Sequence, residues 1–251
     1  MSDHADHPNH PVRQLEPADL WNRFADLNAI PRPSKHEGKV VEWLHEWAAT
    51  KGLESLQDEV GNVLIKKPAT PGMASRKTVV LQSHVDMVCQ KNEATEFDFM
   101  TQGIRMLVDG DWVRAEGTTL GADNGIGVAS ILAVLESRDI PHPALEALFT
   151  IDEETGMTGA LGLQGGFLSG DILLNLDTED DEAWRRISLP VCDAAGNALP
   201  AGATPAPKPP TYSRPIDTFA VARCPTYRRH ASLRAELDSC SATACPAPSP
   251  P

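Results

Sequence analysis

Four short acidic segments, each at the end of an apolar run or at the start of a helix, constrain this 251-residue chain most strongly. In chain order they are SHVD at 83–86, GADNGIG at 121–127, IDEETG at 151–156 and NLDTE at 175–179. Three of them follow strand-like apolar runs, and GADNGIG opens an amphipathic helix. Because open α/β sheets carry their sites at the carboxyl ends of strands, the pattern predicts an α/β fold in which the acids meet at one sheet edge.

The side chains in these segments are of the types that bind divalent metal ions. His84 and Asp86 lie two apart in an extended chain, so both side chains fall on one side, where the carboxylate can orient the imidazole. Asp123 lies where a glycine-flanked loop enters a helix, and a carboxylate there can bridge two ions. The other candidates are Glu153, Glu154 and Asp177. One His with several carboxylates suits zinc first, then manganese or cobalt, and two such ions would lie roughly 3.5 to 4 Å apart.

Each segment also has a simpler interpretation. A His-x-Asp triplet is a common surface pair, and two adjacent glutamates are usually a solvated acidic step. His84 with Asp86, or Glu153 with Glu154, would therefore carry little weight alone. Four such segments in order along the chain favour a two-metal hydrolytic site.

The rest of the N-terminal two thirds predicts a mixed sheet flanked by helices. A first helix is expected from Pro17, with Leu20, Phe24 and Leu27 on one face. Ser34 and Glu37 have the spacing of a capping box for a second helix that ends at Gly52. The remaining expected elements are a hairpin over 54–66, strands at 79–81, 145–151 and 172–176, and a helix over 124–137.

The phrases SHVDMVCQKN, LGADNGIGVA, LFTIDEETGMTGA and LLNLDTED carry a specific resemblance. Residues 11–182 resemble the N-terminal part of aminoacyl-histidine dipeptidases, the cytosolic Xaa-His or non-specific dipeptidases, within the co-catalytic zinc peptidases. The resemblance implies a partial zinc-exopeptidase-like catalytic domain over 15–182, two zinc ions, dipeptide substrates and a water activated by both metals. A homodimer is compatible with the family, although this segment offers no support for one.

The resemblance also implies a role for each candidate residue. His84 and Asp177 would bind one metal, Glu154 the other, and Asp123 would bridge them. Glu153 would be the general base and Asp86 the acid that orients His84. A cis peptide is expected after the bridging Asp123. The family further needs a second metal-binding His and an inserted lid domain, and neither is recognisable in this sequence.

The composition changes abruptly after Glu182. Residues 1–182 hold 14 Lys and Arg against 31 Asp and Glu, whereas residues 183–251 hold 8 against 4, which together give the net charge of −13. Twelve of the 21 prolines and four of the five cysteines lie in this tail, which is poor in large apolar residues. Such a composition predicts disorder, and an out-of-frame origin, over 183–251. The competing interpretation is a native Pro-rich linker or ligand in the polyproline II form.

The start of the chain and its overall charge limit the location and the partners. Residues 1–14 have no basic start followed by an apolar stretch, so they predict a disordered terminus and no signal peptide. No run reaches the roughly 18 apolar residues of a membrane span. A cytoplasmic protein is therefore expected, with Cys89 as a structural thiol. The acidic balance argues against nucleic acid as a partner, because phosphates need a basic surface.

Three functions follow from the sequence as alternatives. The first is a metal-dependent dipeptidase, the second a truncated and inactive relic of one, and the third an interaction protein that acts through its tail. Because His230 is the only His after His142 and lies in the tail, the sequence predicts hydrolysis near background, unaffected by Glu153→Gln.

Overall fold

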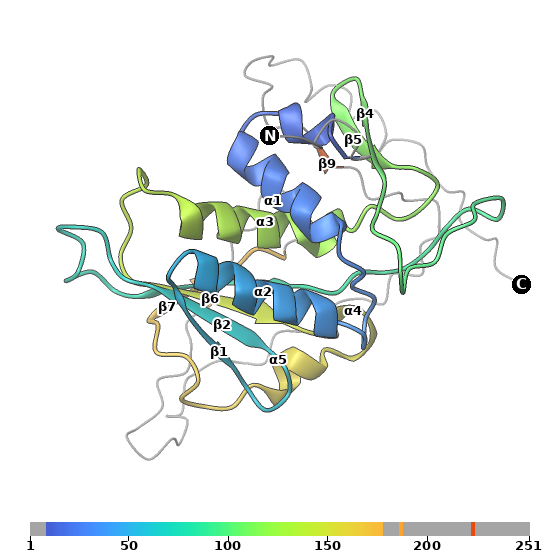
Figure 1. Cartoon of the computed structure of the whole chain (residues 1–251). Coiled ribbons are helices and arrows are strands. Elements are labelled where there is room, and N and C mark those ends of the chain that lie inside the picture. Colours follow the sequence, from blue (N-terminus) through green and yellow to red (C-terminus); the bar gives the residue numbers. More distant parts are fainter. Residues whose placement is uncertain (1–8, 178–185, 188–221, 224–251) are drawn as a thin grey trace, which may run out of the picture.

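The computed structural model describes residues 9–177 and the pairs 186–187 and 222–223. Its centre is a six-stranded sheet with the strand order β1-β2-β6-β3-β7-β8 (Figure 1). The strands of this sheet are β1 (Glu54–Gln57), β2 (Val63–Lys67), β3 (Val79–His84), β6 (Leu145–Thr150), β7 (Ile172–Asn175) and β8 (Arg186–Ile187). A separate sheet, in the order β4-β5-β9, consists of β4 (Met106–Asp109), β5 (Trp112–Ala115) and β9 (Ala222–Arg223).

The middle of the larger sheet is parallel. Strand β3 pairs in parallel with both β6 and β7, while β2 runs antiparallel to β6 and β1 antiparallel to β2. Strands β1, β3, β6 and β7 therefore point in the same direction. All six residues of β6 are buried, as expected for a strand covered on both faces. The predicted α/β class with a mixed, largely parallel sheet is confirmed, as is the predicted hairpin formed by β1 and β2.

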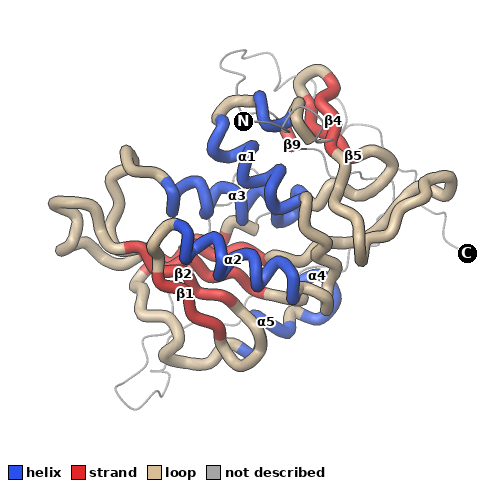
Figure 2. Tube along the Cα trace, in the orientation of Figure 1, coloured by secondary structure: helices blue, strands red, loops and turns tan. Residues whose placement is uncertain are grey.

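Helices α1 (Ala18–Asn28), α2 (Gly38–Thr50) and α3 (Ala122–Glu136) cover one face of the sheet in two layers (Figure 2). The other helices are η1 (Val12–Gln14), α4 (Glu153–Gly156) and α5 (Thr158–Gly162). Helices α2 and α3 share an apolar core with the sheet that includes Leu44, Leu132 and Phe149, and α1 packs on α3. The other face is covered by the loop that contains Phe167 and Leu168. Within the described residues, none of the helices has the length and apolar character to cross a membrane.

The start of α2 differs from its prediction. No side chain caps the helix, which has Glu37 at its N-cap position and begins at Gly38. Glu37 Oε1 instead accepts the backbone N–H groups of Lys35 and Asp152, at 2.8 and 2.9 Å. The Ser34 hydroxyl donates to Asp86. The predicted capping box is therefore wrong, because both side chains find partners far along the chain.

The predicted end of α2 is confirmed. Gly52 has a φ of 68°, and the N–H of Leu53 donates to the carbonyl of Ala48 at 2.9 Å. A left-handed glycine with this bond is the common way to end a helix.

The disorder predicted for the start of the chain is wrong for residues 9–14. Asn9 is 1% exposed; its Nδ2 donates to the carbonyl of Ile104, and its Oδ1 accepts the N–H of Met106. Val12 is fully buried, and Arg13 forms a 2.7 Å ion pair with Asp26. The segment is held by long-range contacts that its composition does not reveal. Residues 1–8 lie outside the described part of the chain.

Two short pieces of the tail belong to the sheets. Residues 186–187 pair antiparallel with β7, and residues 222–223 pair antiparallel with β5. The predictions of disorder and of an out-of-frame origin for 183–251 otherwise fall outside the described residues.

Candidate metal centre

The fold gathers the four acidic segments at one edge of the sheet. His84 is the last residue of β3, Asp123 lies in the first turn of α3, and Asp177 follows the end of β7. Glu153 and Glu154 open α4, directly after β6. Because β3, β6 and β7 are parallel neighbours, their carboxyl ends meet at this edge.

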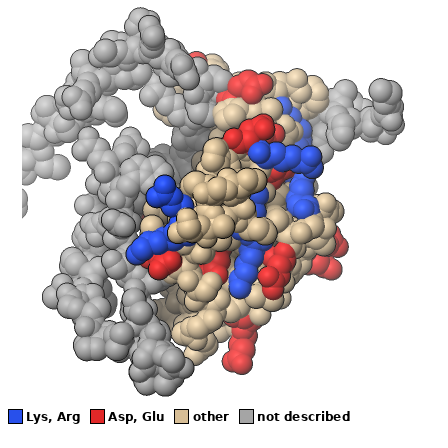
Figure 3. All heavy atoms as spheres, turned by 90° about the vertical axis from the view of Figure 1, so that its left-hand side faces the viewer, with Lys and Arg blue, Asp and Glu red and all other residues tan. Residues whose placement is uncertain are grey.

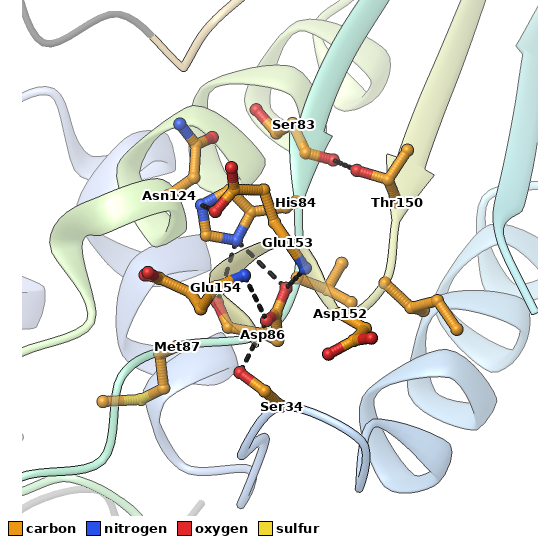
Figure 4. Close-up of polar contacts among 12 residues, drawn as sticks. Ser34, Ser83, His84, Asp86, Met87, Asn124, Thr150, Asp152, Glu153 and Glu154 are labelled. Carbon is orange, nitrogen blue, oxygen red and sulfur yellow. Dashed lines mark hydrogen bonds and ion pairs between the residues drawn. The ribbon is translucent and has the colours of Figure 1, made fainter. Parts of the chain in front are cut away.

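His84 lies at the centre of the cluster, as the close-up in Figure 4 shows for its neighbours Asp86, Glu153 and Glu154. Its Nε2 lies 3.2 Å from Asp123 Oδ1, 3.9 Å from Asp177 Oδ2 and 4.0 Å from Glu153 Oε2. Two groups that include His84 have their ligand atoms within 4.8 Å of one another: His84 with Asp123 and Asp177, and His84 with Glu153 and Glu154. The sequence-predicted residues therefore converge, with Asp123 and Asp177 close enough to share an ion.

Asp86 is fully buried directly behind His84 and has four hydrogen-bond donors around it. His84 Nδ1 lies 3.2 Å from Asp86 Oδ1, so the imidazole proton on Nδ1 points to Asp86 and Nε2 faces the other carboxylates. The Ser34 hydroxyl donates to Asp86 Oδ2 at 2.7 Å, and the N–H groups of Glu153 and Glu154 donate at 3.0 and 3.2 Å. Asp86 thus holds the imidazole and the start of α4 together.

These bonds keep Asp86 ionised. Burial by itself would raise its pKa, but the hydrogen bonds from His84, Ser34 and the Glu153 N–H outweigh burial and lower the pKa to about 2. Because the ionised Asp86 lies next to Nδ1 of His84, it makes Nε2 more basic and therefore a stronger metal ligand.

Replacing Asp86 by Asn is expected to weaken zinc binding about 10- to 100-fold, the range typical of an outer partner of a metal-binding His. The amide keeps the shape of the side chain but loses the charge and one acceptor. Isothermal titration with zinc measures the change. Asp98→Asn is the matched control, because Asp98 also accepts a backbone N–H but is exposed on a distant loop. Equal affinities for Asp86→Asn and the unmodified chain would contradict the orienting role.

The negative charge of the cluster exceeds the one positive charge that its single imidazole can carry. Burial lowers the pKa of His84, but hydrogen bonds with Asp123 and Asp86 and the charge of Asp177 raise it to about 10. Burial, and then the charge of Asp123, raise the pKa of Glu154 to about 7. Burial also raises the pKa of Glu153 and of Asp177. Five carboxylates surround one imidazole. A divalent cation would compensate their negative charge, so the residues present fit such an ion.

Without metal, the chain is expected to lose stability as the pH rises from about 6.5 towards 10. His84 has a folded pKa of about 10 against an ordinary value of 6.5, so its contribution is complete below pH 6.5 and is lost through pH 10. Glu154 acts in the same direction between 4.5 and about 7. Urea unfolding in the presence of a chelator at pH 6.5, 8 and 9.5 measures this. A midpoint that is constant or rises would refute the coupling.

Several neighbouring residues were not anticipated from the sequence. Asn124 Nδ2 donates to Asp177 Oδ1 and to the carbonyl of Leu176, both at 3.0 Å, and so fixes the fourth acidic segment. The expected cis peptide between Asp123 and Asn124 is present. Ser34 and the buried Arg32 come from the IPRPSKHE segment between α1 and α2. The polar residues of that segment precede a helix, which is why they resembled a cap.

Comparison with known proteins shows what this chain is similar to. No family model matches the chain. It is 54% identical over 170 residues to the cytosol non-specific dipeptidase of Escherichia coli, an alignment that covers 68% of this chain and 35% of that protein. The crystal structure of aminoacylhistidine dipeptidase from Vibrio alginolyticus matches with 56% identity and a TM-score of 0.67, again over 68% and 35% of the two chains.

A second solved structure is similar at lower sequence identity. Aminopeptidase PepT from Bacillus cereus is 25% identical with a TM-score of 0.56, over 66% of this chain and 44% of that one. The chain spans about a third of the length of its dipeptidase relatives. Over the matched two thirds of its own length, this chain is therefore similar to an aminoacylhistidine dipeptidase and a cytosol non-specific dipeptidase.

Proposed function

We propose that this chain carries the metal centre of a metal-dependent dipeptidase that hydrolyses Xaa-His and other dipeptides. The observation that carries the proposal is the convergence of two acidic groups on Nε2 of His84, in a segment 54% identical to a cytosol non-specific dipeptidase. Two divalent ions held there would polarise the peptide carbonyl and lower the pKa of a water.

The proposed ligand roles are those that the resemblance to the dipeptidases implies: His84 and Asp177 would bind one ion, Glu154 would bind the other, and Asp123 would bridge them. The close approach of the ligand atoms of His84, Asp123 and Asp177, within 4.8 Å of one another, supports the first set. Besides burial, the charge of Asp123 raises the pKa of both Glu154 and Asp177, which supports a position of Asp123 between them. The donor set of one imidazole and several carboxylates favours zinc, with manganese and cobalt as alternatives.

Glu153 is the general base in this proposal. Its carboxylate faces the cluster 4.0 Å from His84 Nε2 and is 30% exposed, so it touches both the metal ligands and the solvent from which substrate arrives. Burial raises its pKa, which brings the base nearer to the pH at which it must accept and return a proton. Asp86 takes no part in proton transfer and instead orients His84.

The expected partner is a dipeptide, and the face shown in Figure 3 gives no support for nucleic acid. On the face shown in Figure 3, basic and acidic side chains are interspersed and do not form a continuous basic surface. By extension from the Escherichia coli relative, which is named as a cytosolic enzyme, we place the activity in the cytoplasm.

The experiment is hydrolysis of an Xaa-His dipeptide by the full chain after metal removal and the return of zinc, manganese or cobalt. Turnover that needs the metal, and that Asp177→Asn reduces together with zinc binding, would support the proposal. Asp171→Asn is the matched control, because Asp171 is exposed at the opposite end of the same strand. Zinc binding without turnover would instead support the inactive relic expected from the sequence.

A further inference from the structure

Arg32 is buried beside the cluster of acidic residues and is not among the predicted site residues. The residue is 1% exposed, although a fully buried Arg is rare unless its charge is paired. Among the described residues, no carboxylate forms an ion pair with it, and its hydrogen bonds go to main-chain carbonyls and one amide oxygen. Burying a charge without an ion pair costs free energy, so another interaction must account for the position of Arg32.

The guanidinium joins the two segments that carry His84 and Asp123. Its Nη1 donates to the carbonyls of Val85 at 3.0 Å and Asp86 at 3.1 Å, directly after His84. Its Nη2 donates to the carbonyl of Gly121 at 2.7 Å, two residues before Asp123. The planar guanidinium, which donates from two nitrogens, therefore fixes the distance between the end of β3 and the start of α3.

The chain also leaves space for this side chain. Gly121 has a φ of 68°, and a Cβ at this position would collide with Arg32 Nη2. A Cβ at Gly125 would lie 2.9 Å from the same nitrogen. Two of the glycines of GADNGIG thus accommodate the guanidinium. Asn28 Oδ1 accepts the second proton of Nη2 at 3.0 Å and completes the set of acceptors.

We propose that Arg32 is a positioning residue of the metal centre: its guanidinium bridges the carbonyls of Val85, Asp86 and Gly121 and so holds His84 and Asp123 at the spacing that one metal ion requires. This role rests on the proposed metal centre. Its charge also lies close to Asp86, Asp123 and Glu154, and it favours the ionised form of the Asp123 ligand. A lysine has a single ammonium and cannot reach both segments with the same fixed geometry.

The test is the visible absorption spectrum and the affinity of the full chain for Co²⁺, which reports the geometry around the ion. Arg32→Lys is expected to shift the cobalt bands and to weaken cobalt binding about 10- to 100-fold. Asn28→Ala, which removes one acceptor and keeps the guanidinium, is expected to shift the same bands less. All spectra are recorded at a temperature at which circular dichroism shows a folded protein.

The matched control is Leu64→Ala. Leu64 is fully buried in the apolar cluster on the other face of the sheet, so its truncation destabilises the fold without touching Arg32. It is expected to leave the cobalt bands unchanged. Unchanged bands and affinity in Arg32→Lys, or an equal shift in Leu64→Ala, would overturn the positioning role. If the unmodified chain binds no cobalt, the proposed metal centre itself is wrong.

Discussion

With the proposed metal centre, and in contrast to the background rate expected from the sequence alone, dipeptide hydrolysis by the zinc-loaded chain is expected to fall about 10²- to 10⁴-fold when Glu153 is replaced by Gln. This is the range that a positioned general base contributes. The amide has nearly the same shape but cannot accept a proton. Glu153 is held in place through its own N–H, which donates to Asp86, so the substitution leaves that bond intact. Zinc affinity should change far less than the rate.

The assay compares kcat for an Xaa-His dipeptide with zinc binding measured on the same preparation. Glu93→Gln, an exposed Glu outside the cluster, controls for the change in charge. A rate lost together with zinc would make Glu153 a ligand. A rate near background in both proteins, with zinc bound, would support the relic predicted from the sequence.

His84→Ala is expected to weaken zinc binding by more than the roughly 100-fold that loss of an outer partner can reach. Both groups of ligand atoms contain His84, so removing the imidazole damages both at once. It also leaves Asp86 buried and without one of its donors, which is costly for a carboxylate. Isothermal titration gives the affinity, and unfolding in urea gives the cost in stability.

His45→Ala is the control for that experiment. His45 lies on α2 and its Nδ1 is 2.9 Å from the Ser55 hydroxyl, away from the cluster. Its removal should leave zinc affinity unchanged. Zinc binding that survives in His84→Ala but disappears in His45→Ala would place the metal elsewhere.

The sequence by itself predicted the strands, the convergence of the proposed ligands at one sheet edge and the similarity to dipeptidases. Each of these depends on a few consecutive residues: an apolar run dictates a buried strand, and the polar residues that end it lie at the sheet edge. His84, Asp123 and Asp177 were therefore predictable from local patterns. The β4–β5 hairpin was not, because its Leu107, Val108 and Trp112 are exposed and give no clear alternation of buried and exposed positions.

Only the tertiary structure revealed what holds the proposed ligands in place. Arg32 meets Val85 and Gly121 across 53 and 89 residues of chain, and Glu37 meets Asp152 across 115. Contacts between residues so far apart depend on how α1 packs on α3 and how α2 packs against the sheet. No local pattern separates Ser34 and Glu37 as a helix cap from the same two residues as supports of a metal site. The proposed ligands are thus set by short segments of sequence, and their arrangement in space is set by the packed fold.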